Sequence, residues 1–312
     1  MPAAVVLKLF RLAMIVFQAI QKQIHIQSIH HMQKLLYTII FTTFLGACTP
    51  LQFALINVPS LTYEGQISED VPYGQLPRQK LDIYVPNIDR ETFPVVVFFH
   101  GGRWTDGSKK QYKFVAMTLS NMGYVVVLPN TRLYPDVKFP TFAEDAAKSV
   151  AWVYENIASY KGNQNLFISG HSSGAHLGAL IIADDSYLAA FELKPNIVTA
   201  FAGISGPYDF VPKAPDIKDM FGPVENYPNM VVTNFIDGNE PPMLLIYTGE
   251  DDTVHPRNLE ALKAGIENVN GTVQTIIYKT GGHAAPLAAF SWANPSNLPV
   301  PEDIDDFFKM FL

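Results

Sequence analysis

The hydrophobic residues of this 312-residue chain fall into short apolar runs that are separated by stretches with helical spacing. Residues 94–99 and 124–128 are continuously apolar, as expected of central parallel strands buried on both faces. Residues 81–85 alternate apolar and polar positions, which is typical of an edge or half-buried strand. Further strands are expected at 165–169, 197–204, 242–247 and 272–278, and helices at 111–122, 141–160, 173–183, 258–269 and 301–311. This alternation predicts an α/β fold whose mostly parallel sheet is covered by helices on both faces.

The same pattern gives the domain organisation. Residues 76–312 form one predicted catalytic domain, and residues 48–75, rich in Pro, Ser, Thr and Gly, are expected to be a linker or lead-in. Within the domain, residues 207–241 carry scattered Pro, Asp and aromatic residues with little periodicity. We expect this stretch to form a short cap over the site. The sequence indicates no particular oligomeric state.

The N-terminal part has the layout of a secretory signal peptide at residues 32–47. Met32 and Lys34 precede a short apolar stretch, which is too short for a typical membrane-spanning helix. Leu45-Gly46-Ala47-Cys48 then resembles the lipobox of bacterial lipoproteins, in which the cysteine is lipidated and becomes the mature N-terminus. This resemblance predicts a membrane anchor at Cys48; the alternative is an ordinary signal peptide with an incidental cysteine.

The residues on either side of Cys48 refine this prediction. Thr49, rather than Asp, follows the cysteine, which by resemblance to the sorting rules of diderm bacteria favours the outer membrane and its periplasmic face. Residues 1–31 are expected to be an upstream extension that precedes a true start at Met32, or else a second membrane-proximal segment.

Charge and cysteine content exclude several classes of partner. The chain has a net charge of −7, yet residues 1–47 contain four basic residues and no acid, so the rest holds 18 basic against 29 acidic residues. An acidic body without Lys/Arg clusters argues against a nucleic-acid partner. Cys48 is the only cysteine, so no intramolecular disulfide can form. No metal or organic cofactor is expected, because neither an H-E-x-x-H motif nor a Cys/His cluster occurs.

The motif that carries candidate chemistry is Gly170-His171-Ser172-Ser173-Gly174, which reads G-x-S-x-G. It stands between a predicted strand and a predicted helix, the context of a nucleophile elbow. Glycines suit such a turn because the backbones pass close to one another. Ser172 would lie at its tip, exposed at the positive end of the following helix.

A serine hydroxyl is a weak nucleophile at neutral pH and needs a base that is oriented by an acid. Among the histidines after Ser172, His176 lies one turn along the same helix, and His255 directly precedes another helix. His283 lies in a Gly-Gly-His loop after a strand, where small neighbours give the imidazole access to the serine. Glu250, Asp251 and Asp252 follow the strand 242–247 and compete for the role of the acid.

These residues together resemble the α/β-hydrolase superfamily. The His100-Gly101-Gly102-Arg103-Trp104 segment, the G-H-S-S-G-A-H stretch and the G-G-H loop look like the small carboxylesterases of the hormone-sensitive-lipase and kynurenine-formamidase-like branch. The resemblance covers residues 75–312 and implies an α/β-hydrolase fold. In that superfamily the triad runs Ser, acid, His along the chain.

The resemblance also implies roles for individual residues. The spacing of Asp252 from Gly249 is similar to the acid loop of many esterases, so Asp252 is expected to orient His283. The backbone N–H groups of Gly102, Arg103 and Ser173 would form the oxyanion hole. His100 and Gly101 would support that loop. Trp104 is interpreted either as a wall of the acyl pocket or as core packing.

The resulting interpretation is an exported serine carboxylesterase that hydrolyses small to medium acyl esters through an acyl-enzyme on Ser172. Its partner would be a small-molecule ester. An arylformamidase-like amide hydrolase with the same triad remains an alternative, as does a long-chain lipase. A catalytically inactive surface binding module is the alternative from a different class.

Overall fold

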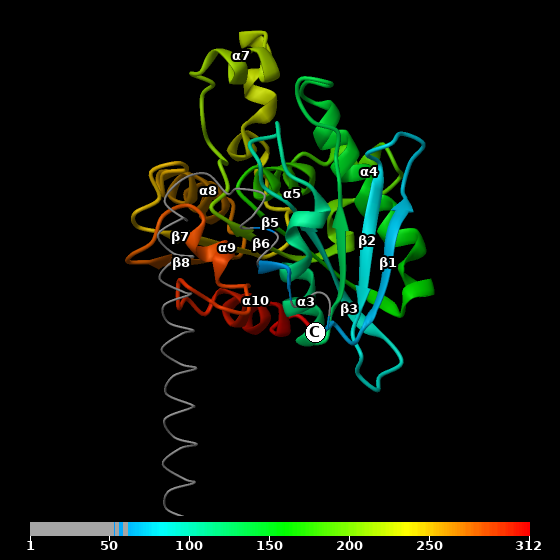
Figure 1. Cartoon of the computed structure of the whole chain (residues 1–312). Coiled ribbons are helices and arrows are strands. Elements are labelled where there is room, and N and C mark those ends of the chain that lie inside the picture. The colour runs from blue at the N-terminus through cyan, green and yellow to red at the C-terminus, as the bar shows by residue number, and fades with distance from the viewer. Residues whose placement is uncertain (1–52, 54–55, 59–61) are drawn as a thin grey trace, which may run out of the picture. The chain divides into compact units, whose positions relative to one another are not determined.

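A computed structural model describes Phe53, residues 56–58 and residues 62–312 (Figure 1). The predicted signal peptide, Cys48 and residues 1–31 lie outside the described residues. Within the described residues no helix is both long and apolar enough to cross a membrane.

The described strands form one eight-stranded sheet in the order β1-β2-β4-β3-β5-β6-β7-β8. β1 and β2 pair antiparallel, as do β2 and β4, and every later pair is parallel. The strands are β1 Gln66–Pro72, β2 Lys80–Val85, β3 Phe93–Phe99, β4 Val125–Pro129, β5 Gly162–His171, β6 Val198–Ile204, β7 Met243–Thr248 and β8 Val273–Tyr278. The predicted fold class is confirmed.

Helices alternate with these strands along the chain (Figure 1). The α-helices are α3 Lys113–Asn121, α4 Thr141–Asn156, α5 Ser173–Ala183, α6 Ser186–Ala189, α7 Pro215–Phe221, α8 Arg257–Asn268, α9 Ala285–Ala288 and α10 Val300–Lys309. The 3-10 helices are η2 Lys109–Tyr112, η3 Ile157–Tyr160, η4 Pro195–Ile197, η5 Val224–Met230 and η6 Val232–Phe235.

Each face of the sheet has its own hydrophobic core. Along β3, Val95 and Val97 belong to one cluster of buried side chains, and Val96 and Phe98 belong to the other. The first cluster includes side chains of α4, α5 and α8, and the second includes those of α3, α9 and α10. A strand buried on both faces must be apolar at every position, which explains the unbroken apolar run in its sequence.

β1 lies inside the stretch 48–75 that was expected to be a linker or lead-in. Its sequence is largely polar and its residues are exposed or half-buried, because it forms the edge of the sheet and only one side pairs. A bulge between Ser68 and Val71 interrupts the pairing with β2, and Asp70 there has a φ of 57°. A strand of this kind gives little hydrophobic periodicity from which to predict it.

A buried ion pair holds the segment that follows the His100–Trp104 loop against the β1–β2 edge of the sheet. Lys109 begins η2, and its ammonium contacts both the buried carboxylate of Asp82 on β2 and, at 2.8 Å, the exposed carboxylate of Asp70. The side chains of Lys109 and Asp82 are 1% and 0% exposed. The backbone N–H of Lys109 also donates to the Asn130 side chain at 2.7 Å.

Replacing Lys109 by Met should therefore destabilise the protein strongly, because the substitution leaves the carboxylate of Asp82 buried without its cation. We expect a loss of about 3–5 kcal/mol in the free energy of unfolding, measured by urea denaturation. Lys113→Met is the matched control, since Lys113 pairs with Glu69 at the surface and should cost no more than about 1 kcal/mol. Equal losses in the two variants would contradict this assignment.

Candidate active site

The G-x-S-x-G sequence forms a sharp turn between β5 and α5. Ser172 has φ 54° and ψ −123°, a conformation that non-glycine residues seldom adopt. A Cβ on Gly174 would lie 2.2 Å from the carbonyl oxygen of Phe99, and one on Gly170 would lie 2.6 Å from the carbonyl carbon of Gly174. The turn therefore requires glycine at both positions. It presents Ser172 beyond the carboxyl end of β5, at the beginning of α5.

The structure brings Ser172 and His283 together. The Ser172 hydroxyl lies 2.8 Å from Nε2 of His283, and Nδ1 of His283 lies 2.8 Å from a carboxylate oxygen of Asp251. A carboxylate accepts, so Nδ1–H donates to Asp251, and the serine hydroxyl then donates to the unprotonated Nε2. The three residues come from the end of β5, the loop after β7 and the loop after β8.

The prediction of Asp252 as the orienting acid is wrong: the residue in contact with His283 is Asp251. The carboxylate of Asp251 is buried and also accepts the backbone N–H groups of Thr253 at 3.0 Å and Val254 at 2.8 Å. Asp252 is exposed, and its side chain accepts only a long hydrogen bond from the Thr253 hydroxyl among the described residues. The tight turn after β7 directs side chain 251 inward and side chain 252 outward.

The surroundings of Asp251 favour its ionised form. Burial alone would raise the pKa of Asp251, but the hydrogen bond and charge of His283, together with the N–H of Val254, lower it below its ordinary value. Asp251 can therefore stay anionic and stabilise a protonated His283. Glu250, the third candidate acid, accepts the backbone N–H of Gly281 at 2.8 Å, which links the acid loop to the loop that carries His283.

Two of the three residues predicted to supply oxyanion-hole donors, Arg103 and Ser173, line the cavity that contains Ser172. Arg103 has a φ of 55°. Among the described residues, the N–H groups of Gly102, Arg103 and Ser173 donate no hydrogen bond within the protein. Gly102, with φ 128°, does not line the cavity, and a Cβ there would lie 2.1 Å from the carbonyl oxygen of Asp106. Gly101 donates its N–H to the Tyr112 hydroxyl at 2.9 Å instead.

The side chains of His100 and Trp104 hold the His100–Trp104 loop in place. His100 is buried and its Nδ1–H donates to the carbonyl oxygen of Gly101 at 2.8 Å; burial lowers the pKa of His100 to about 4. Trp104 lies on the cavity wall and is only 6% exposed. Its ring stacks on Phe210 of the cap, with a centroid distance of 5.7 Å, and meets the edge of Phe221 at 4.9 Å. Trp104 therefore serves both as pocket wall and as core packing.

A cavity of about 340 Å³ opens above Ser172. The cap supplies an apolar side through Phe210, Val211 and Ile217, and the loop after β7 supplies a polar side that includes Asp252 and His255. The predicted position of the cap, next to the serine, is therefore observed. The part of the chain that the structure describes contains no group of three or more His, Cys, Asp or Glu side chains that could hold a metal ion.

The model of the protein family BD-FAE matches residues 81–266, which is more than half of the chain. The chain belongs to the BD-FAE family. The matched segment contains Ser172 and Asp251, and His283 follows it.

Relatives and solved structures with similar folds are hydrolases by name. Kynurenine formamidase from Danio rerio is 35% identical over 143 residues, which are 46% of this chain and 47% of that protein. The chain thus spans about half the length of this curated relative. Esterase LipQ from Mycobacterium tuberculosis is 29% identical over 263 residues, covering 75% of this chain and 62% of LipQ. An inhibited esterase B from Lactobacillus rhamnosis superposes with a TM-score of 0.71 at 18% identity, over 89% and 96% of the two chains, and so shares the fold.

One site residue of this BD-FAE protein was missed by the sequence analysis. His171, the residue before the serine, is buried, and its Nε2–H donates to the backbone carbonyl of His283 at 3.1 Å. Burial, aided by the nearby His283, lowers the pKa of His171 to about 3, so this imidazole stays neutral. In the sequence, the feature that points to His171 is its position inside the G-x-S-x-G motif, directly before the serine. His176, another of the candidate histidines, is buried and its Nε2–H donates to the Met230 carbonyl at 2.7 Å.

The two neighbouring aspartates allow a direct test of the acid assignment. Asp251→Asn should lower kcat by about 10⁴-fold, because an amide at this position favours the wrong imidazole tautomer and cannot stabilise the imidazolium. Asp252→Asn is the matched control and should leave kcat within a few-fold of the parent. Steady-state hydrolysis of p-nitrophenyl acetate measures both, and a large loss in Asp252→Asn alone would overturn the assignment.

Proposed function

We propose that the protein is a serine carboxylesterase that hydrolyses small to medium acyl esters through an acyl-enzyme on Ser172. The observation that carries the proposal is the hydrogen-bonded chain from Ser172 through His283 to the buried Asp251. The family membership and the esterase LipQ relative support ester hydrolysis. A cavity of about 340 Å³ lies near the lower end of the ~300–1,000 Å³ typical of ligand pockets, which favours a small acyl group.

The proposed reaction has two balanced halves. His283 takes the hydroxyl proton as Ser172 attacks the acyl carbon, and the ester oxygen leaves with that proton as the alcohol. A water molecule then repeats the sequence: it loses a proton to His283 and attacks the acyl-enzyme, and the proton returns to Ser172 as the carboxylic acid departs. Asp251 holds the imidazole and stabilises its charged form in both halves.

Charge also develops on the acyl oxygen in each half. The N–H groups of Arg103 and Ser173 are the donors best placed to bind it, because both residues line the cavity with Ser172 and neither N–H is used within the described protein. The N–H of Gly102 is a third candidate from the same loop. One such donor typically supplies about 2.7–4 kcal/mol of transition-state stabilisation.

Removing the nucleophile tests the proposal. Ser172→Ala should reduce hydrolysis of short p-nitrophenyl esters by about 10⁶-fold and abolish labelling by a fluorophosphonate probe, while the circular dichroism spectrum stays unchanged. Ser173→Ala is the control, because its backbone N–H survives the substitution and much of the activity should remain. Normal turnover by a folded Ser172→Ala protein would sink the mechanism. A folded parent protein that neither turns over esters nor reacts with the probe would favour the inactive binding module.

A second candidate function is hydrolysis of an aryl formamide. The kynurenine formamidase relative favours it, since that protein is 35% identical to this chain over 143 residues, and the same triad can cleave a C–N bond. We expect the ester to be preferred when matched N-formyl aryl amides and aryl formate esters are compared by kcat/KM. A higher kcat/KM for the amide would reassign the enzyme as a formamidase without changing its nucleophile.

A further inference from the structure

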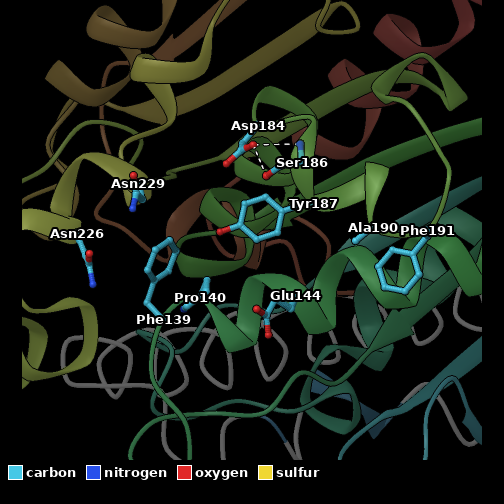
Figure 2. A pocket seen from close by; sticks show the side chains of 10 residues that line it. All are labelled: Phe139, Pro140, Glu144, Asp184, Ser186, Tyr187, Ala190, Phe191, Asn226 and Asn229. Atoms are coloured by element: carbon cyan, nitrogen blue, oxygen red, sulfur yellow. Dashed lines mark hydrogen bonds between the residues drawn. The ribbon is translucent and has the colours of Figure 1, made fainter.

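A second cavity, of about 570 Å³, lies between the beginning of α4, α6 and η5 of the cap (Figure 2). It is at the opposite end of α5 from Ser172, where Asp184 follows the helix. Its polar side chains are mostly exposed, among them Glu144, Asn226 and Asn229. Water can satisfy exposed groups, so these side chains do not select a ligand. A polar group that is buried beside the reacting atoms gives stronger grounds for assigning a role.

His171 is such a buried polar group. It is the last residue of β5, its exposed fraction is only 5%, and Ser172 follows it directly. Its Nε2–H donates to the backbone carbonyl of His283 at 3.1 Å, and the centroids of the two imidazole rings lie 4.9 Å apart. The side chain of His171 takes no part in the proton transfer assigned to Nε2 of His283, so its burial at this place needs another explanation.

The Nδ1 edge of the His171 ring faces the His100–Trp104 loop. A Cβ on Gly101 would lie 2.9 Å from Nδ1 of His171 and 3.1 Å from the backbone carbonyl oxygen of His171. The imidazole therefore packs against the backbone of Gly101 and leaves no room for a side chain there. The N–H of Gly101 also donates to the hydroxyl of Tyr112 at 2.9 Å, which fixes the same point of the loop.

The hydrogen bonding of His171 also determines its protonation. A carbonyl oxygen only accepts, so the proton lies on Nε2, and Nδ1 is buried without a hydrogen-bond partner among the described residues. A proton on Nδ1 would place a buried charge there without an acceptor. Burial, together with the nearby His283, lowers the pKa of His171 to about 3. The imidazole is therefore a neutral, rigid spacer between the two loops near neutral pH.

We propose that His171 is a positioning residue that sets the placement of the general base relative to the oxyanion donors. Its backbone leads into Ser172, its Nε2–H holds the loop of His283, and its Nδ1 edge supports the loop that carries the N–H of Arg103. The proposal rests on the proposed esterase mechanism, because it concerns the geometry of the same site. Loss of the Nε2–H donor should slow the chemical step more than it weakens substrate binding, since Nε2 of His283 would no longer be held at the serine hydroxyl.

Two substitutions of similar size separate the hydrogen bond from the volume of the side chain. His171→Gln keeps an N–H donor at about the reach of Nε2, whereas His171→Met fills the space without a donor. We expect His171→Met to lower kcat for p-nitrophenyl acetate by about 10- to 100-fold, with KM within about twofold of the parent value, and His171→Gln to recover most of that loss. Equal losses of kcat in the two variants, or parent kcat in His171→Met, would overturn the proposal.

Tyr124→Phe is the matched control for a loss of stability alone. Tyr124 is buried directly before β4, and its hydroxyl donates to Asp305 of α10 at 2.9 Å. Removing this hydroxyl should lower the midpoint of urea unfolding, as His171→Met also should, but kcat should stay within about twofold of the parent value. A fall of kcat in Tyr124→Phe as large as that in His171→Met would show that lost stability explains both effects, and the positioning role would be wrong.

A measurement without substrate separates this role from the esterase assignment. The Nδ1–H of His283, in its hydrogen bond to Asp251, should give a proton NMR resonance well downfield of the backbone amides. We expect this resonance to persist in Ser172→Ala and in His171→Gln, and to broaden or disappear in His171→Met, because a displaced imidazole no longer protects the proton from exchange with water.

The two kinds of measurement give distinguishable outcomes. If the parent protein hydrolyses no ester and yet shows this pattern of resonances, the positioning role of His171 stands and the proposed function fails. If the parent is an active esterase and His171→Met leaves both the resonance and kcat unchanged, the proposed function stands and the positioning role fails.

Discussion

The close approach of α5 to the carboxyl end of β3 is the constraint on which the rest of the site depends. Residue 174 passes so near the carbonyl oxygen of Phe99 that only glycine fits. This contact fixes the first turn of α5, which the chain enters at Ser172 with a positive φ of 54°. It also sets the beginning of α5 beside the loop that begins at His100, since β3 and β5, the strands that lead into the two sides of the contact, are parallel neighbours in the sheet.

The arrangement of Ser172, His283 and Asp251 is held in place largely by hydrogen bonds to the backbone. The loop that carries His283 is bound from two sides: the imidazole of His171 donates to the carbonyl of His283, and the carboxylate of Glu250 accepts the N–H of Gly281. The turn at Asp251 is closed by two N–H groups that point at its own carboxylate. Such contacts fix loop positions without consuming the groups that would take part in proton transfer, which are Nε2 of His283 and the serine hydroxyl.

The sequence predicts those parts of the molecule that depend on burial and on close backbone contact. Continuous apolar runs such as 94–99 identify the central strands, and the paired glycines around Ser172 identify the turn. Local spacing could not separate Asp251 from Asp252, because two adjacent carboxylates differ only in the direction that the turn gives each side chain. β1 escaped prediction because an exposed edge strand needs no apolar alternation. The contact of His171 with His283 joins residues far apart in the chain, so no local pattern reports it.

The irregular edge strand has a consequence for association as well as for the site. An exposed strand edge offers unpaired N–H and C=O groups to any other extended chain, and charge, proline and bulges oppose such pairing. β1 has all three, in Glu69 and Asp70, in Pro72, and in the interruption between Ser68 and Val71. The same bulge brings the carboxylate of Asp70 to the ammonium of Lys109, which anchors the chain just beyond the His100–Trp104 loop. The bulge in β1 that opposes edge-to-edge aggregation therefore also helps to fix the position of the His100–Trp104 loop beside Ser172.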